Sequence, residues 1–225
     1  MDNPVTRNNT ASVSLHPAVR YGVFALMIIA VSVGDGLAMK AGIGTTAYEA
    51  FSLTLSYLTS FKVGTLAMCF NVTMILLQLI LSRRFNFRTL LQIPVVIVQG
   101  QVLNFIVYVF LGKVVMRNYA MRLAFLLGGF TVSACSIGIL MALDVIVFPL
   151  EGFCYALSEK IPVSFPKVRQ AADAICIILA LILTFLFRLE LTIREGSVIG
   201  MLIFSPIMGF SMNWFKKHVM HLPKV

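Results

Sequence analysis

Charged residues divide the chain into long apolar stretches of similar length. Crossing the hydrocarbon core of a bilayer, which is ~30 Å thick, takes a helix of ~20 apolar residues, and the stretches between the charges have about this length. We therefore predict six membrane-spanning helices, at residues 21–41, 63–82, 89–111, 123–143, 168–187 and 196–215.

Two further apolar segments fit none of these spans. Residues 43–60 are rich in Ser and Thr and contain Glu49, and residues 145–158 contain Pro149 and Glu151. The second segment, with 14 residues, is too short to cross, and short apolar segments of this kind are typical of re-entrant or interfacial helices. We predict such a short helix in each segment. The alternative is that both segments cross, which would give eight spans.

The second half of the chain resembles the first. With one small gap, Glu49 aligns with Glu151 and Asn71 aligns with Asp173, in the same order along the chain. Each half then holds three spans and one short segment. Because three is an odd number, the second half would enter the membrane in the opposite orientation. We predict an all-α polytopic membrane fold made of two inverted three-helix repeats, an architecture that recurs in transporters.

This repeat also sets the expected organisation of the chain. The first apolar run is span-length and no small-residue cleavage site follows it, so we expect an uncleaved first helix. The predicted segments are a polar N-terminal tail at 1–19, the first repeat at 20–112, a connecting loop at 113–122, the second repeat at 123–215 and a basic C-terminal tail at 216–225.

Composition agrees with a lipid environment, because hydrophobic residues make up 59% of the chain and charged residues 12%. Soluble proteins carry about 25% charged residues. The formal net charge of +9 would favour a nucleic-acid partner in a soluble protein. Here the basic residues lie mainly between the apolar runs, where they set membrane topology. More of them fall on the inner side if the chain starts there, so we predict cytoplasmic termini and no nucleic-acid partner.

Several short motifs resemble the YczE/YyaS/YitT-type family of bacterial integral membrane proteins over roughly residues 20–212. The resemblance implies a multi-span fold in the inner membrane of a bacterium, and it implies little about a substrate. The motifs are Lys40-Ala41-Gly42-Ile43-Gly44, Phe148-Pro149-Leu150-Glu151-Gly152, the helix of Asp173, Arg194-Glu195-Gly196-Ser197 and Ser205-Pro206.

Glu49 and Glu151 are the first candidate pair for a site, because a carboxylate inside a membrane is costly and is often functional. The pair could bind a cation, exchange a proton or hold a cationic substrate. A structural role is equally open. Glu49 is the last residue of a capping box that starts at Thr46, and Glu151 follows Pro149 at the expected start of a helix.

Asn71 and Asp173 form the second candidate pair, each about two turns into a span. Asn71 could instead make an interhelical hydrogen bond. Arg169 lies four residues before Asp173 and could neutralise it on the same helix face. The ion pair could be structural or functional.

A third set of polar residues, Gln101, Asn104 and Tyr108, shares one face of the third span at helical spacing. This face could line a polar cavity or pack against other helices. Asp35 and Asp144 lie near the ends of equivalent spans, and we predict that their carboxylates reach the water at the membrane interface.

We predict a small-solute transporter-like protein with a site at the repeat interface. Two alternatives remain: an accessory or structural protein that supports a biosynthetic or envelope process, and a substrate-binding subunit of an energy-coupled importer. Enzyme signatures are missing, so we expect no catalytic residues, cofactor or metal. The expected partners are the lipid bilayer and a small solute, alone or with a proton or cation. A GxxxG match at Gly196–Gly200 leaves a homo-oligomer open. The candidate site residues are Glu49, Glu151, Asn71, Asp173, Asn104 and Gln101.

Overall fold

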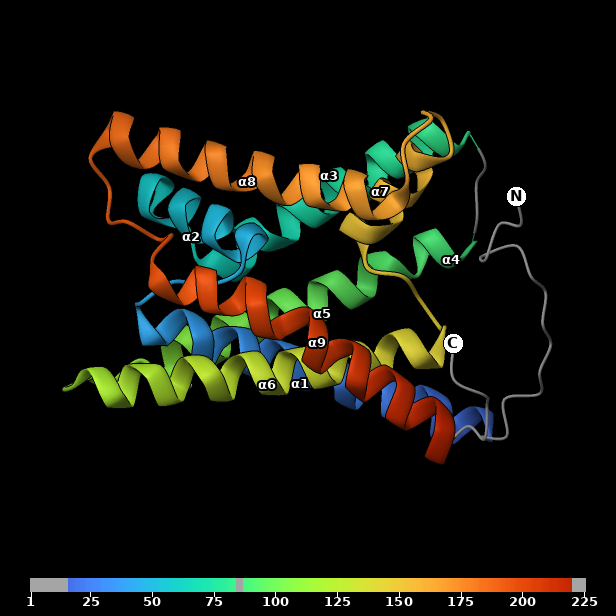
Figure 1. Ribbon diagram of the computed structural model, residues 1–225, viewed down its shortest axis with the longest axis horizontal. Helices are drawn as coiled ribbons and strands as arrows, with labels where there is room; N and C mark the ends of the chain where they lie inside the picture. Colours follow the sequence, from blue (N-terminus) through green and yellow to red (C-terminus); the bar gives the residue numbers. More distant parts are fainter. Residues whose placement is uncertain (1–15, 84–86, 220–225) are drawn as a thin grey trace.

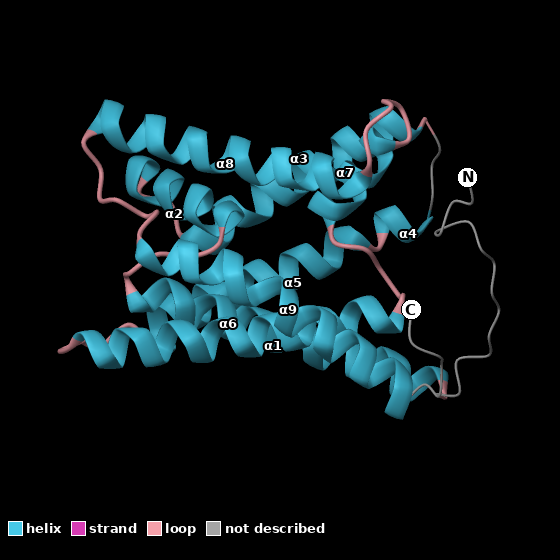
Figure 2. Cartoon of the chain, in the orientation of Figure 1, coloured by secondary structure: helices cyan, strands magenta, loops and turns pink. Residues whose placement is uncertain are grey.

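A computed structural model describes residues 16–83 and 87–219, and every regular element in that part of the chain is a helix (Figure 2). Six helical stretches are long and apolar enough to cross a membrane, and each overlaps one of the six predicted spans. The chain is therefore a multi-pass membrane protein. The elements are α1 Pro17–Ala41, α2 Ala47–Thr59, α3 Val63–Ser82, α4 Phe87–Leu90, α5 Gln92–Asn104, a π-helical turn Phe105–Phe110, α6 Tyr119–Leu143, α7 Pro149–Ser158, α8 Phe165–Phe187 and α9 Glu195–His218.

The ends of these helices follow from local sequence signals. Pro17 and Pro149 stand in the first turns of α1 and α7, where a missing N–H costs nothing. The side chain of Asn118 caps α6 by accepting a hydrogen bond from the Met121 N–H, at 2.8 Å. Gly42 ends α1 in the left-handed conformation, with φ 66°, which glycine adopts without strain.

The two short helices cannot cross a membrane. α2 has 13 residues and α7 has 10, so they extend about 20 Å and 15 Å. Lys40 Nζ lies 3.4 Å from the Gly112 carbonyl, and Lys62 Nζ lies 6.0 Å from the ring centroid of Tyr108. Both lysines thus contact the same end of the third span. The chain therefore enters and leaves the α2 segment at one end of the bundle, and the eight-span alternative is wrong.

The long helices run side by side, and α2 and α7 lie toward opposite ends of the bundle (Figure 1). In that view α2, α3, α7 and α8 form the upper part, and α1, α6 and α9 form the lower part, with α5 between them. α1 packs against α6 at a close backbone contact. A Cβ placed on Gly34 would lie 2.7 Å from the Gly129 carbonyl oxygen. The glycines bring these two long helices near enough for small side chains to meet.

The helices of the two halves begin at a constant spacing of 102 residues, as the pairs 17 and 119, 47 and 149, and 63 and 165 show. Contacts repeat with the same spacing. Arg20 Nε donates to the Leu143 carbonyl at 3.0 Å, and Arg122 Nη1 donates to the Ala41 carbonyl at 3.5 Å. Each half thus holds the end of the other half's first long helix with an equivalent arginine.

Some predicted boundaries and contacts change. α6 begins at Tyr119, inside the predicted loop 113–122, and α9 continues to His218, past the predicted end of the second repeat at 215. Residues 1–15 of the predicted tail at 1–19 and residues 220–225 of the predicted tail at 216–225 lie outside the described residues. The predicted GxxxG motif is used within the chain, because a Cβ on Gly196 would meet the Ile43 carbonyl and one on Gly200 would meet the Phe130 ring. The motif is therefore not free to form a dimer.

Candidate functional site

One pocket between α1, α2, α3 and α5 contains two buried acids, Asp35 and Glu49. Asp35 is 9% exposed and Glu49 is 5% exposed. Asp35 lies six residues before the end of α1 and Asn71 lies eight residues after the start of α3, so the pocket is about 9–12 Å from that end of the bundle. That depth places it within a hydrocarbon core of about 30 Å.

Glu49 is held at the start of α2 by the predicted capping box. Its Oε2 accepts a hydrogen bond from the Thr46 backbone N–H at 3.3 Å, and it also accepts one from the Thr45 hydroxyl. The positive end of the helix dipole favours a negative group at this position. The Glu49 side chain therefore caps α2 and also lines the pocket.

Asp35 lies where the sequence does not predict it. The prediction that its carboxylate reaches interfacial water is wrong, because Asp35 is buried and its Oδ1 accepts a 2.5 Å hydrogen bond from the Ser133 hydroxyl of α6. The Gly34–Gly129 contact brings α6 within reach of this carboxylate. Asp144, its predicted counterpart, is exposed and ends α6 in the left-handed conformation at φ 47°.

Neutral polar groups complete the pocket. Tyr48 lies between α2 and α3, where its hydroxyl donates to the Ala67 carbonyl at 3.2 Å and accepts from Asn71 Nδ2 at 2.8 Å. The predicted interhelical hydrogen bond of Asn71 is thus formed. Two buried oxygen atoms in the lining residues, Ser52 Oγ and Gln99 Oε1, have no hydrogen-bond partner. Among the residues that line the pocket there is no Lys or Arg.

The pocket is small. Its lining residues leave room for about one water molecule. A proton, a water molecule or a bare small ion fits there, whereas an organic solute does not fit in this conformation.

The second candidate carboxylate lies in a separate cluster. Glu151 of α7 pairs with Arg169 of α8 at 3.2 Å, and the Arg169 guanidinium also pairs with Asp173 one turn along the same helix. The three side chains are 27–34% exposed. The Arg169–Asp173 pair is the one that the sequence predicts, and the Glu151 contact is an addition to it. Both acids in this cluster pair with the same basic side chain, Arg169.

The predicted site residues are therefore divided among four places, one of which is the exposed face of α5 that carries Gln101. Glu49 and Asn71 line the pocket, and Glu151 and Asp173 belong to the Arg169 cluster. Asn104 holds the start of α3, because its side chain accepts from the Gly64 N–H at 2.8 Å and donates to Thr65 at 3.1 Å.

Gln101, Asn104 and Tyr108 do not form one shared face that lines a cavity. The Tyr108 hydroxyl accepts a hydrogen bond from the Val63 N–H at 3.1 Å, so it too holds the start of α3. Gln101 is exposed on the outside of α5. The π-helical turn at Phe105–Phe110 changes the spacing on which the shared face depends. The sequence reasoning missed Ser52 and Ser133, and ordinary serines in apolar helices carry no signal that separates them from packing residues.

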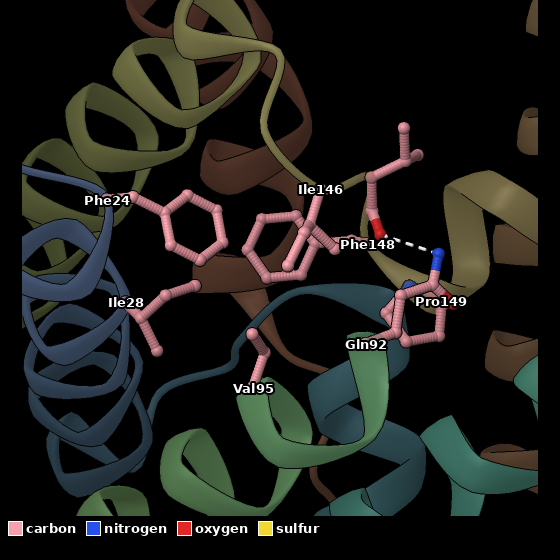
Figure 3. A pocket seen from close by; sticks show the side chains of 8 residues that line it. Phe24, Ile28, Gln92, Val95, Ile146, Phe148 and Pro149 are labelled. Atoms are coloured by element: carbon pink, nitrogen blue, oxygen red, sulfur yellow. Dashed lines mark hydrogen bonds between the residues drawn. The ribbon is translucent and has the colours of Figure 1, made fainter. Parts of the chain in front are cut away.

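The segment that leads into α7 is apolar. In Figure 3, Phe148 lies beside Phe24, with Ile28, Val95 and Ile146 around them. The Gln92 side chain fixes the segment by donating from Nε2 to the Val147 carbonyl at 2.9 Å. This packing holds the start of α7 in place and leaves no acid in the pocket that it surrounds.

The described residues contain no group of three or more His, Cys, Asp or Glu side chains that could hold a metal ion. Comparison with curated proteins and with solved structures found no match. A comparison with protein families found one that matches residues 18–213, which is most of the chain. That match does not link the chain to the YczE/YyaS/YitT-type proteins, so this resemblance stays a prediction. The chain belongs to the family described as "Family of unknown function (DUF6198)".

Proposed function

We propose that this protein is a small-solute transporter-like protein of a bacterial inner membrane, built from two inverted repeats, with its site at the Asp35–Glu49 pocket. The observation that carries the proposal is the pair of buried carboxylates within the spanning region, with no basic side chain lining their pocket. Ionisable residues inside a membrane are expensive and mark ion and substrate pathways.

The repeat architecture has independent support. Three pairs of helix starts are offset by 102 residues, and the Arg20 and Arg122 contacts are equivalent at that offset. Gly36 packs against Ile106, and Gly138 packs against Met208, which are also equivalent pairs. A reciprocal contact of this kind is expected when two halves are related by a two-fold axis, and inverted repeats place their sites at discontinuous helices near the repeat interface.

The short helices give the proposed transporter its moving parts. The pocket has room for about one water molecule, so a solute gains access only when α2 shifts relative to α1, α3 and α5, which form the other walls. α2 is joined to the connection between α8 and α9 by the hydrogen bond of Thr54 Oγ1 with Thr192 Oγ1 at 2.7 Å, and to α3 by that of the Tyr48 hydroxyl with the Ala67 carbonyl at 3.2 Å. The proposed movement follows the general behaviour of inverted-repeat transporters, in which one group of helices moves as a rigid body against another.

The proposed orientation places both termini in the cytoplasm. α1 begins and α9 ends at the same end of the bundle (Figure 1). The last turn of α9 carries Lys216, Lys217 and His218, and basic residues at helix ends favour the cytoplasmic side.

The experiment begins with a screen of small solutes for thermal stabilisation of the purified protein in detergent. A stabilising solute is then tested for uptake into liposomes that hold the wild type, Glu49→Gln or the matched variant Glu151→Gln. We expect Glu49→Gln to lower uptake at least tenfold and Glu151→Gln to retain it at equal protein level. If no solute stabilises the protein or enters the liposomes, an accessory role replaces transport.

A further inference from the structure

We propose that the Asp35–Glu49 pocket binds a single desolvated alkali-metal cation through oxygen ligands. The inference concerns the site of the proposed function, and it rests on that function only in assigning the ion a role in coupling. Binding itself is argued from the two halves of the chain and from the atoms that face the pocket.

Equivalent positions beside Glu49 and Glu151 in the two halves differ in charge. Glu49 and Glu151 are each the third residue of their short helix. Position 169, the fifth residue of α8, is an arginine that pairs with Glu151, whereas position 67, the fifth residue of α3, is an alanine that lines the pocket of Glu49. The second half therefore carries its own cation where the first half has only a methyl group.

The first half has more negative charge to compensate as well. Glu49 interacts with Asp35 across the pocket, and no basic side chain lines it. Two carboxylates in a low-dielectric site repel each other strongly. The compensating positive charge comes from outside the chain, either as a proton on one carboxylate or as an ion bound between the two.

Two buried oxygen atoms of the residues that line the pocket have no hydrogen-bond partner. Ser52 is fully buried, and its Oγ has no hydrogen-bond partner; the same is true of the buried Oε1 of Gln99. Both residues line the pocket with the two acids. An unpaired buried polar atom costs about 1–3 kcal/mol. A cation would satisfy these oxygens together with the carboxylates, whereas a proton on one carboxylate can donate to one acceptor alone.

The size and the ligands of the pocket define the class of ion. Ca²⁺ takes about 6–8 oxygen ligands, and Mg²⁺ retains several waters, whereas the pocket has room for about one water molecule. A single positive charge shared by two carboxylates would repeat the balance of the other half, where the one guanidinium of Arg169 pairs with both Glu151 and Asp173. The described residues also lack the cluster of three His, Cys, Asp or Glu side chains that would hold a transition metal.

The test is thermal unfolding of the purified full chain in detergent, at equal ionic strength of NaCl, KCl, LiCl or choline chloride. We expect at least one alkali cation to raise the Tm in a saturable way, on the order of 5 °C at a hundredfold excess over its Kd. Asp35→Asn and Glu49→Gln should lose this rise, and the matched variant Glu151→Gln should retain it.

Ser52→Ala keeps the test decisive if the acid variants do not fold, because it removes one oxygen and leaves both carboxylates. We expect it to weaken the cation affinity severalfold while the Tm in choline chloride stays equal or rises, because the variant removes a buried oxygen that has no partner without the ion. Equal Tm values in all four salts, or a rise that Glu49→Gln and Ser52→Ala fully retain, would overturn the inference. A Tm rise without any solute uptake contradicts the proposed transport alone, whereas uptake without a cation effect contradicts the ion site alone.

Discussion

Glu49 and Glu151 occupy equivalent positions in the two halves, but their surroundings differ in charge. Glu151 faces Arg169, which also binds Asp173, so two acids share one basic group and lie 27–34% exposed. Glu49 is 5% exposed and shares its pocket with a second acid. One half thus has a fixed internal ion pair, and the other has an internal charge that the chain does not balance.

The segment that leads into α2 makes polar contacts, whereas the segment that leads into α7 packs through apolar side chains. Before α2, the Thr45 N–H donates to Ser197 Oγ at 3.1 Å, and its hydroxyl donates to Glu49. Before α7, the equivalent residue is Val147, and Phe148 packs beside Phe24 (Figure 3). A duplicated architecture can thus keep one half as a support whose acids are paired with a basic side chain, and use the other half as the polar site.

The largest expected effect comes from breaking the internal ion pair of the second half. Arg169→Ala leaves Glu151 and Asp173 without their cation. Removing one partner of a fully buried pair costs about 3–5 kcal/mol, and the partial exposure of these side chains reduces the expected loss of unfolding free energy to about 3 kcal/mol or less. SDS titration in mixed micelles measures this change.

The control for that variant removes the acids as well. Arg169→Ala combined with Glu151→Gln and Asp173→Asn leaves no unpaired charge, so it should recover most of the lost stability. If the single variant is as stable as the wild type, or the triple variant is less stable than the single one, the ion pairs of the Arg169 cluster do not stabilise the second half.

A smaller effect is expected from the contact that joins the halves. Gly34→Ala places a Cβ 2.7 Å from both the Gly129 carbonyl oxygen and the Ser133 backbone nitrogen. Because backbone atoms cannot turn aside, α1 and α6 must separate, and overpacking of this kind costs about 1–3 kcal/mol. The shift also moves Ser133 away from Asp35, so the cation-dependent rise in Tm should decrease.

Gly128→Ala is the matched control for Gly34→Ala, because a Cβ at position 128 meets no atom within 4 Å. The control should retain both the Tm in choline chloride and the rise in alkali salts. Equal Tm values for the two variants would show that the close contact of α1 and α6 does not limit stability.

The six spans could be predicted because bilayer thickness fixes the length of a charge-free run, and each predicted span overlaps an observed one. The start of α7 at Pro149 and the capping box of Glu49 were also predictable, since both depend on residues within one turn. The Arg169–Asp173 pair followed from its spacing of four residues on one helix.

The composition of the pocket could not be predicted in the same way. Asp35 lies near the end of an apolar run, and its burial depends on Gly34 and Gly129, which are far apart in sequence. The contact of Glu151 with Arg169 joins two helices, so helical spacing carries no information on it. The constant offset of 102 residues does pair Ala67 with Arg169, and that pairing is the sequence signal that separates the two halves.

The smallest expected effect comes from the hydrogen bond that orients Asp35. Ser133→Ala removes the hydroxyl that donates to Asp35 Oδ1 at 2.5 Å, and a net loss of about 1 kcal/mol is typical of one such bond. If Asp35 is a ligand, the loss is expected in cation affinity, as an increase in Kd of about fivefold, with little change of the Tm in choline chloride. Ser136→Ala is the matched control one turn along α6, because its hydroxyl donates to the Val132 carbonyl of its own helix at 2.7 Å. A cation titration of Tm that gives the same Kd for both variants would remove Asp35 from the proposed ligand set, and the first half would then differ from the second through Glu49 alone.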